Sequence, residues 1–231
     1  MTFGVEMELQ LLRADTLRLA AAAPAIFARW KGGHSRVSAE IFQSMIEVKT
    51  GVCRDMRLAR TDLRKTLRHL RRICRSLRVR LASAGSHPSS RYLNRIPYPG
   101  ERYKTLIDRN QWLARRLCIF GLHVHVGMRN GEHAAAMVNA MLPYLPHLLA
   151  LSASSPFWQE HDTGLASARA TVFEAVPTGG HPCTFKTWED FEVLYDAMIV
   201  SRSITSIKDI WWDIRPHPDL GTVEVRVCDG L

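Results

Sequence analysis

The chain has 231 residues, of which 46% are hydrophobic and 23% charged, a composition typical of a soluble globular protein with one large domain or two small ones. Its net charge is +9, and its five cysteines are scattered without a CxxC pair. This excludes a disulfide framework and a zinc knuckle and indicates a reducing cytoplasm. No apolar run is expected to cross a bilayer, and the segment 19–27 lacks the basic start of a signal peptide.

The predicted elements begin with a strand and a helix. Alternating apolar and polar residues predict a strand at 3–12, and a helical stretch is expected at about 16–30. A polar turn at 31–36 leads to a segment that carries Glu40, and a second strand follows at about 44–50.

Residues 54–80 are the most basic part of the chain, with eleven Arg or Lys against two Asp. Apolar residues recur there at spacings of four, three, four and three, which predicts an amphipathic helix with the arginines on its outer surface. Such a helix can bind phosphate backbones, but no aromatic residues that could stack on bases interleave the charges. A solvated outer face is therefore favoured, and nucleic acid is a disfavoured partner.

The second half of the chain mixes strands and helices of uneven spacing. In chain order we expect a strand near 79–84, a Pro- and Ser-rich loop at 86–100, a helix at 101–117, a strand at 121–127, a helix at 131–152 that stops before Pro156, an irregular region at 153–187, a helix at 188–201 and strands at 210–215 and 221–228. This order predicts an α+β fold with a largely antiparallel sheet.

Several predicted strands place two ionisable side chains on one face, because residues i and i+2 of a strand share a face. The pairs are Glu6 with Glu8, Glu47 with Lys49, His123 with His125, Asp213 with Arg215, and Glu224 with Arg226. A half-exposed sheet explains any single pair. Two neighbouring glutamates, however, repel each other unless a positive charge lies between them.

These carboxylates and an imidazole are typical of a site for divalent cations. Glutamates suit Mg²⁺ or Mn²⁺, and one imidazole is compatible with Mn²⁺, so the predicted ligands are Glu6, Glu8, Glu47, His123 and Glu224. Arg226 would then face an anion held by the metals, such as phosphate. Alternation predicts this chemistry on one sheet face, but it does not show that the strands are neighbours.

Five segments in the same order resemble the carboxylate–amine ligases of the glutamate–cysteine ligase type. They are FGVEMELQL (3–11), EIFQSMIEVKTGVC (40–53), GLHVHVG (121–127), LSASSPFWQEHDTGLASAR (151–169) and WWDIRPHPDLGTVEVRVCD (211–229). The resemblance implies a glutamine-synthetase-like catalytic domain: a curved, mainly antiparallel sheet with helices on its outer face. Residues 1–231 would be a single catalytic domain without the family's C-terminal helical part.

The resemblance implies an ATP-dependent ligation of L-glutamate to an amine such as L-cysteine through γ-glutamyl phosphate, with Mg²⁺ or Mn²⁺ as cofactor. The absence of a GxxxxGK[ST] motif fits an ATP site carried by a sheet and counts against a P-loop kinase. A cytoplasmic enzyme with small-molecule substrates and no membrane is implied, and a homodimer is left open.

The resemblance also assigns roles to individual residues. The implied metal ligands are Glu6, Glu8, Glu40, Glu47, His123 and Glu224. His125 would lie behind them or near the substrate. Arg226 and Arg169 would be catalytic residues that contact phosphate or a carboxylate, and Arg215, Lys208 and Asp162 would be further contacts to ATP or substrate.

Other functions stay open at this stage: a ligase with a different amine acceptor, a metal-dependent amide or phosphate hydrolase, or an anion- or nucleic-acid-binding protein acting through the basic helix 54–80. Some residues also have purely structural explanations. Glu40 could start a helix and Arg215 could pair with Asp213. The residues favoured as core rather than chemistry are Trp158, Trp211, Trp212, Cys53, Cys118 and Cys228.

Overall fold

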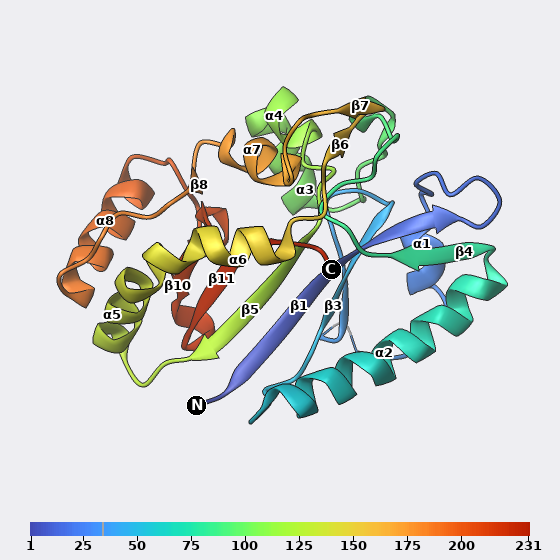
Figure 1. Cartoon of the computed structure of the whole chain (residues 1–231). Helices are drawn as coiled ribbons and strands as arrows, with labels where there is room; N and C mark the ends of the chain where they lie inside the picture. Colours follow the sequence, from blue (N-terminus) through green and yellow to red (C-terminus); the bar gives the residue numbers. More distant parts are fainter. Residues whose placement is uncertain (34) are drawn as a thin grey trace.

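A seven-stranded sheet forms the centre of the computed structural model, which describes residues 1–33 and 35–231 (Figure 1). The strands lie in the order β10–β11–β5–β1–β3–β2, with β4 also paired to β1, and every pair is antiparallel. They are β1 (Phe3–Arg13), β2 (Val37–Ala39), β3 (Met45–Lys49), β4 (Val79–Ala82), β5 (Gly121–Gly127), β10 (Ile214–His217) and β11 (Thr222–Asp229). The predicted α+β fold with a mainly antiparallel sheet is confirmed.

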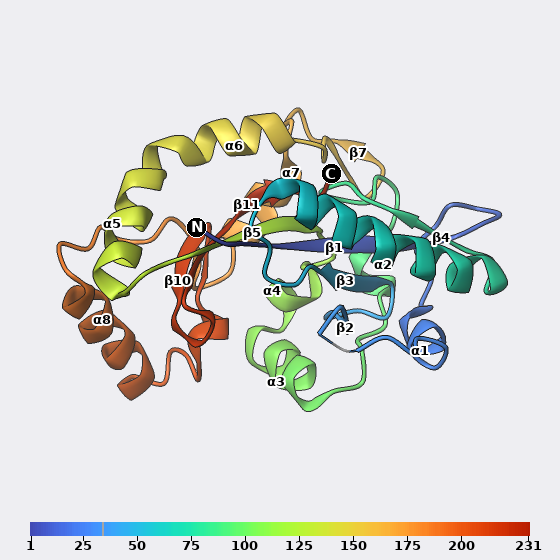
Figure 2. The same ribbon diagram turned by 90° about the horizontal axis from the view of Figure 1, so that it is seen from below.

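Helices cover one face of this sheet. Helix α2 (Met56–Ser76) packs on β1, β3 and β4, and α5 (Gly131–Met141) and α6 (Leu145–Ser152) pack on β10 and β11. Figure 2 shows β10 and β11 at a steep angle to β1, so the sheet curves away from these helices. The remaining helices are α1 (Ala23–Phe27), α3 (Glu101–Asn110), α4 (Trp112–Arg115), α7 (Ala168–Glu174) and α8 (Trp188–Val200).

The two faces of the sheet differ because side chains alternate along each strand. Leu9 of β1 and Val225 of β11 belong to the apolar clusters under the helices. Glu6, His123 and Glu224 point to the opposite face, where they line a pocket. The alternation in the sequence therefore separates a hydrophobic core from a polar, concave face.

Helix α2 confirms the prediction for the basic segment. Asp55 caps its N-terminus, where the side chain accepts a hydrogen bond from Leu58 N at 2.9 Å. Leu70 and Cys74 are buried against the sheet, as the apolar spacing predicts. The arginines of the segment lie on the exposed side of the helix.

The helix predicted at 16–30 is wrong over most of its length. Strand β1 continues to Arg13, and the chain then turns back so that Arg13 N donates to Arg18 O and Ala20 N donates to Leu11 O. Leu17 has φ 57° at this turn, and only Ala23–Phe27 are helical. Pairing with the end of β1 overrides the local helical preference of this alanine-rich stretch.

Two other predicted helices are interrupted, and the irregular region contains structure. The helix at 101–117 breaks at Gln111, where φ is 45°. The helix at 131–152 passes through a 3₁₀ turn, Leu142–Tyr144, at the prolines. Within 153–187 lie α7 and the two-residue strands β6 (Phe157–Trp158), β7 (His161–Asp162) and β8 (Gly179–Gly180), of which β8 pairs in parallel with β9 (Trp211–Trp212).

The segment Gly131–Ser152 reaches the length and mean hydropathy of a membrane span, contrary to the expectation that no apolar run does so. Of its most apolar 18-residue window, 22% is buried. Val138 and Leu145 are nevertheless fully buried in the core beneath it, because α5 and α6 pack on β10 and β11. Apolar helices on the core of a folded domain meet the same criterion.

Candidate active site

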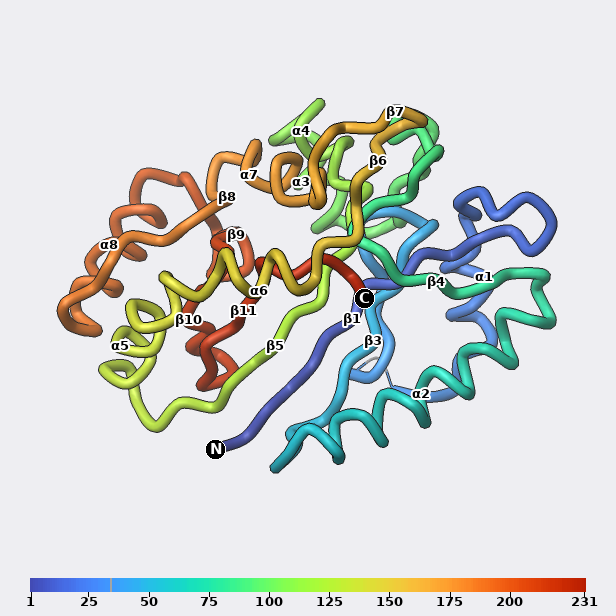
Figure 3. The backbone as a smooth tube through the Cα atoms, in the orientation of Figure 1, coloured from blue at the N-terminus to red at the C-terminus, as the bar shows by residue number. Residues whose placement is uncertain are grey.

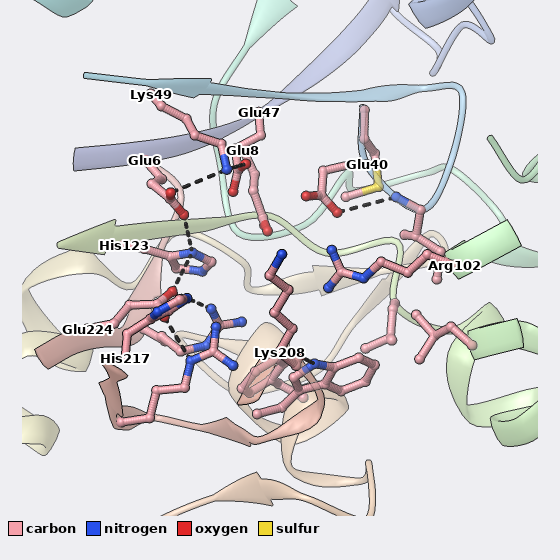
Figure 4. Close-up of a pocket in the computed structure, with 18 of the residues that line it drawn as sticks. Glu6, Glu8, Glu40, Glu47, Lys49, Arg102, His123, Lys208, His217 and Glu224 are labelled. Atoms are coloured by element: carbon pink, nitrogen blue, oxygen red, sulfur yellow. Dashed lines mark hydrogen bonds and ion pairs between the residues drawn. The ribbon is translucent and has the colours of Figure 1, made fainter. Parts of the chain in front are cut away.

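A pocket of about 380 Å³ opens on the polar face of the sheet (Figure 4). Ten of the twelve predicted site residues line it: Glu6, Glu8, Glu40, Glu47, His123, His125, Lys208, Arg215, Glu224 and Arg226. They come from β1, β3, β5, β10, β11 and two connecting segments. The sheet therefore brings together groups that are up to 220 positions apart in the chain, from Glu6 to Arg226.

Strand pairing brings these groups together. Glu8 lies opposite Glu47 where β1 pairs with β3, and Glu6 lies opposite His123 where β1 pairs with β5. Glu224 lies opposite His125 where β11 pairs with β5. Directly paired residues have adjacent side chains on the same face, so each pairing adds an ionisable side chain to one cluster.

Three groups of side chains have ligand atoms that all lie within 4.8 Å of one another. They are Glu6, Glu47 and His123; Glu6, His125 and Glu224; and Glu8, Glu40 and Glu47. Ligands of Mg²⁺ lie at about 2.1 Å from the ion, so neighbouring ligand atoms around it are about 3 Å apart and opposite ones about 4.2 Å. The groups have the spacing of cation ligands.

Unpartnered imidazole nitrogens test whether these residues fit a metal. His123 Nδ1 and His125 Nε2 are buried and have no hydrogen-bond partner in the described part of the chain. His123 Nδ1 lies 3.7 Å from Glu6 and 3.5 Å from Glu224, distances too long for a hydrogen bond. A buried nitrogen without a partner is costly, and a cation between it and the carboxylates would remove that cost. The residues therefore fit divalent cations.

Further contacts orient the ligands from behind. His125 Nδ1 lies 3.0 Å from Thr222 Oγ1, which leaves Nε2 directed at the carboxylates. Glu8 accepts a hydrogen bond from Gly121 N at 2.5 Å, and Glu47 accepts one from Ser38 Oγ at 2.9 Å. Both contacts are made to Oε2, and Oε1 of each carboxylate accepts no hydrogen bond within the described residues.

The carboxylates of the pocket repel one another. Burial raises the pKa of Glu40 well above its usual value, and the carboxylates of Glu47 and Glu8 raise it further. Burial also raises the pKa of Glu47, with Glu6 adding to the shift. Lys49 Nζ lies 2.5 Å from Glu47 and 3.3 Å from Glu6 and offsets part of this repulsion. The cluster therefore favours the binding of positive charge.

Glu6 and Glu224 have the opposite electrostatic balance. Burial would raise the pKa of Glu224, but the guanidinium groups of Arg226 and Arg215 hold it below the usual value. Burial would also raise the pKa of Glu6, but contacts with His123 and His125 lower it. Both side chains therefore stay ionised as potential ligands.

Two arginines hold Glu224. Arg215 Nε donates to Glu224 Oε2 at 2.8 Å, and Arg226 NH1 donates to Oε1 at 2.5 Å. The explanation that Arg215 pairs with Asp213 is wrong, because Asp213 lies 3.1 Å from His181 Nδ1 instead. Arg215 NH1 also donates to the carbonyls of Ile207 and Ile210. These contacts occupy Arg215, whereas the buried Nε of Arg226 has no partner within the described residues.

Arg169 lies behind the pocket and does not line it. Its side chain is buried, and its NH1 and NH2 donate to the carbonyls of Val227 and Arg226 at 3.1 Å each. The pairing of β11 with β5 shifts register between Val225 and Cys228, so ordinary ladder bonds are missing here. Arg169 therefore supports the strand that carries Arg226.

Asp162 also lies outside the pocket. It is exposed in β7, and its Oδ1 accepts a hydrogen bond from Gly164 N at 3.0 Å. The β6–β7 hairpin places the side chain in a surface turn, so the structure does not bring this predicted ligand-binding residue to the other ten.

Several residues that line the pocket were not predicted as site residues from the sequence. Arg102 and Tyr103 of α3, Trp211 of β9 and His217 of β10 all line the cavity. Arg102 faces the carboxylates from the opposite wall, beside Lys208 (Figure 4). No motif marks Arg102 in its sequence, since it follows the start of an ordinary amphipathic helix.

Most of the residues that we expected in the core are buried there. Cys53, Cys118, Cys228 and Trp212 are buried, as predicted. Trp211 packs beside an apolar cluster but also lines the cavity, so its assignment to the core is only partly right. Glu40 lies in the connection between β2 and β3, and the explanation that it starts a helix is wrong.

Comparison with known proteins places the chain in a family. The profile of "Glutamate-cysteine ligase family 2 (GCS2)" matches residues 2–231. A protein of Bdellovibrio bacteriovorus named "Putative glutamate--cysteine ligase 2" is 50% identical over 230 residues, which are 100% of this chain and 61% of that protein. A protein of Gloeobacter violaceus with the same name is 44% identical over 99% of this chain and 62% of its own length.

Two solved structures share the fold at 13% sequence identity. A bifunctional glutathione synthetase from Pasteurella multocida has a TM-score of 0.73 and covers 99% of this chain, which spans 35% of that protein. A glutamate–cysteine ligase from Francisella tularensis in complex with AMP has a TM-score of 0.64 over 99% of this chain and 61% of its own. The chain spans about 61% of the length of its relative from Bdellovibrio bacteriovorus. From the match over residues 2–231, the chain belongs to the glutamate–cysteine ligase family 2.

Proposed function

We propose that this chain carries the active site of an ATP-dependent carboxylate–amine ligase that joins L-glutamate to an amine such as L-cysteine. The observation that carries the proposal is the cluster of Glu6, Glu47 and His123, in which the buried Nδ1 of His123 has no hydrogen-bond partner among the described residues. A nucleoside triphosphate and a carboxylate substrate are both anions, so cations must separate them from the carboxylates of the pocket. Family membership and the names of the relatives agree with this chemistry.

The metal ligands are assigned from the three groups of donors. Glu8, Glu40 and Glu47 would hold one divalent ion, and Glu6 and Glu224 with His123 and His125 would hold the others. Bound Mg²⁺ or Mn²⁺ neutralises phosphate charge and stabilises the charge that develops during transfer. The carboxylates contribute one wall of the site, and the substrates would approach from the open side of the sheet.

The opposite wall would bind the anionic groups. Neither Lys208 Nζ nor the Arg102 guanidinium has an ion pair or hydrogen bond within the described residues, and both line the cavity. Arg226 is held by Glu224 at NH1 but has an unpartnered Nε. These three cations would orient phosphate oxygens and the carboxylate of the substrate.

The proposed reaction has two steps. The γ-carboxylate oxygen of glutamate bonds to the γ-phosphorus of ATP, and ADP leaves. The amine nitrogen then bonds to the acyl carbon and loses a proton, the C–O bond between the acyl carbon and the phosphate breaks, and inorganic phosphate leaves with that oxygen. Arg226 would stabilise the phosphoryl oxygens in both steps, since charge on them develops beside its guanidinium.

The purified chain should release ADP only when Mg²⁺, ATP, L-glutamate and an acceptor amine are all present. The measurement is a coupled ADP assay over a panel of amines, with products identified by mass spectrometry. A γ-glutamyl amide with one equivalent of ADP supports the ligase. Turnover of an amide or phosphate ester without ATP would overturn it in favour of a metal-dependent hydrolase.

A matched pair of variants ties this activity to the pocket. Arg226→Gln should lower ADP release at least 100-fold, because about 2.7–4 kcal/mol is typical for the loss of one charge-stabilising donor. Arg115→Gln, an exposed arginine outside the pocket, should leave the rate unchanged. A cytoplasmic location remains a prediction of the same proposal. A homodimer is left open, and size-exclusion chromatography with light scattering tests it.

A further inference from the structure

The outer face of α2 and the residues that flank this helix in the chain carry a dense set of exposed cations. The eleven side chains, here called the α2 basic face, are Arg54, Arg57, Arg60, Arg64, Lys65, Arg68, Arg71, Arg72, Arg75, Arg78 and Arg80. All are exposed, and none has an ion pair in the part of the chain that the structure describes. Ordinary solvated helices intersperse acids with bases, because like charges at i and i+4 destabilise a helix.

The two acids of this segment do not neutralise the α2 basic face. Asp55 caps the helix through Leu58 N. Asp62 accepts a hydrogen bond from Gly51 N at 2.8 Å and pairs with Arg36, which comes from outside the segment. Both carboxylates are therefore occupied, and the face keeps its positive charge.

The arginines form a continuous line. Six of them recur at spacings of three or four residues, which places them on one stripe of the helix: Arg57, Arg60, Arg64, Arg68, Arg71 and Arg75. At 1.5 Å per residue, the stripe is about 27 Å long. A duplex carries about one phosphate charge per 1.7 Å of its axis, so a stripe of this length faces a long run of phosphates.

Shallow grooves on both sides of the helix extend the surface. One of about 530 Å³ is lined by Arg71, Arg75, Arg78 and Arg80, where β4 joins the helix. The other, of about 500 Å³, is lined by Lys65, Arg68 and Arg72, and by the paired side chains of Arg36 and Asp62. The cationic surface therefore continues past the end of the helix through Arg78 and Arg80.

From this arrangement we infer that the α2 basic face binds the phosphate backbone of double-stranded nucleic acid. Ten of its eleven cations are arginines, whose planar fork matches phosphate oxygens better than an ammonium group does. The absence of interleaved aromatic residues argues against stacking on single-stranded bases, but duplex binding through the backbone needs no stacking. Binding without sequence preference is expected.

An anionic membrane fits this surface less well. A membrane-surface helix inserts its apolar face between lipids, but Leu70, Ile73 and Cys74 of α2 are buried against the sheet. Only the charged side is free. The α2 basic face also lies across the sheet from the pocket, so binding there does not depend on the proposed ligase function.

Fluorescence anisotropy with labelled 20-base-pair DNA and RNA duplexes, from 50 to 200 mM NaCl, tests the inference. The wild-type chain should bind both duplexes with an affinity that falls steeply with salt. The variant Arg68→Glu/Arg71→Glu/Arg75→Glu should bind at least tenfold more weakly at 50 mM NaCl. Its log–log salt slope should be smaller by about 2.7, since each lost phosphate contact contributes about 0.9.

A matched control separates local from overall charge. Arg115→Glu/Arg129→Glu/Arg202→Glu changes three exposed arginines without ion pairs elsewhere on the described surface, and it carries the same net charge. This variant should bind within about threefold of wild type. Equal losses in the two variants would overturn the inference, as would absence of duplex binding at 50 mM NaCl. Binding to phosphatidylglycerol vesicles without binding to duplex would also overturn it.

Discussion

The two faces of the central sheet are built from alternate residues of the same strands, yet they have opposite physical properties. On the helix-covered face, Leu9 and Val225 join apolar clusters that exclude water. On the pocket face, Glu6 and Glu224 are held among imidazoles and arginines that are also largely removed from water. The first arrangement stabilises the fold by burying apolar area, and the second places charges where desolvation is costly.

The pocket face gains little stability from its charges. Buried ion pairs roughly balance their desolvation cost, and several carboxylates here have raised pKa values. A face that is unfavourable by itself and has unpartnered nitrogens is suited to a ligand that supplies positive charge. Substitutions on the two faces should therefore have different effects on stability and on metal binding.

The largest expected effect on stability is at Glu224. Glu224→Gln leaves Arg215 and Arg226 without their carboxylate partner, and loss of one member of a buried pair typically costs about 3–5 kcal/mol. Urea unfolding monitored by circular dichroism measures the change. Adding Arg215→Met should recover at least half of the loss. If Glu224→Gln alone were as stable as wild type, the expected cost of leaving Arg215 and Arg226 without their partner would be wrong.

A core substitution under α2 should separate stability from metal binding. Leu70→Ala removes a fully buried side chain and should lower the free energy of unfolding by about 3 kcal/mol. Mn²⁺ affinity, measured by isothermal titration calorimetry on the folded fraction, should stay within twofold. A tenfold loss of affinity would mean that the two faces are coupled.

A substitution of Glu40 should have the reverse effect of Leu70→Ala: it should lower Mn²⁺ affinity without lowering stability. Glu40→Gln removes a proposed metal ligand and a repelling charge, so Mn²⁺ affinity should fall at least tenfold, about 1.4 kcal/mol. The metal-free protein should be equally stable or more stable by up to about 1 kcal/mol. Glu101→Gln, at an exposed position at the start of α3, is the matched control and should change neither quantity. Loss of stability in Glu40→Gln without loss of affinity would contradict the assignment.

The smallest expected effect on stability is at His87, a buried histidine outside the pocket. His87 Nε2 lies 2.8 Å from Leu17 O, and Nδ1 accepts hydrogen bonds from Ser89 N and Ser90 N, so the ring must be neutral. Burial lowers the pKa of His87 below its usual value. The folded state therefore binds this proton less readily than the unfolded state, and stability is lost as pH falls below about 6.5.

The loss from His87 is at most about 1.4 kcal/mol per pH unit for this single proton. His87→Asn keeps an acceptor oxygen but does not titrate, so its urea midpoint should change less between pH 7.5 and pH 5.5 than that of wild type. His147→Asn, at an exposed histidine, should behave as wild type does. Identical pH profiles for His87→Asn and wild type would show that this ring does not control acid stability.

The sequence by itself determined which residues could share a face. Alternation in FGVEMELQL, GLHVHVG and TVEVRV is a local property of an extended chain, so it correctly separated Glu6 and His123 from their apolar neighbours. The apolar period of α2 likewise predicted its buried side. Ten of the twelve predicted site residues line one pocket, although their individual roles stay predictions until they are measured.

Only the tertiary structure decided which strands are neighbours and which polar residues stay out of the pocket. The pairing of Glu8 with Glu47 and of Glu224 with His125 depends on contacts between distant segments, which no local period encodes. The same is true of the β1 extension that replaced the predicted helix at 16–30 and of the carbonyls that bind Arg169. Local sequence sets the direction of a side chain, but packing between remote segments sets what it meets.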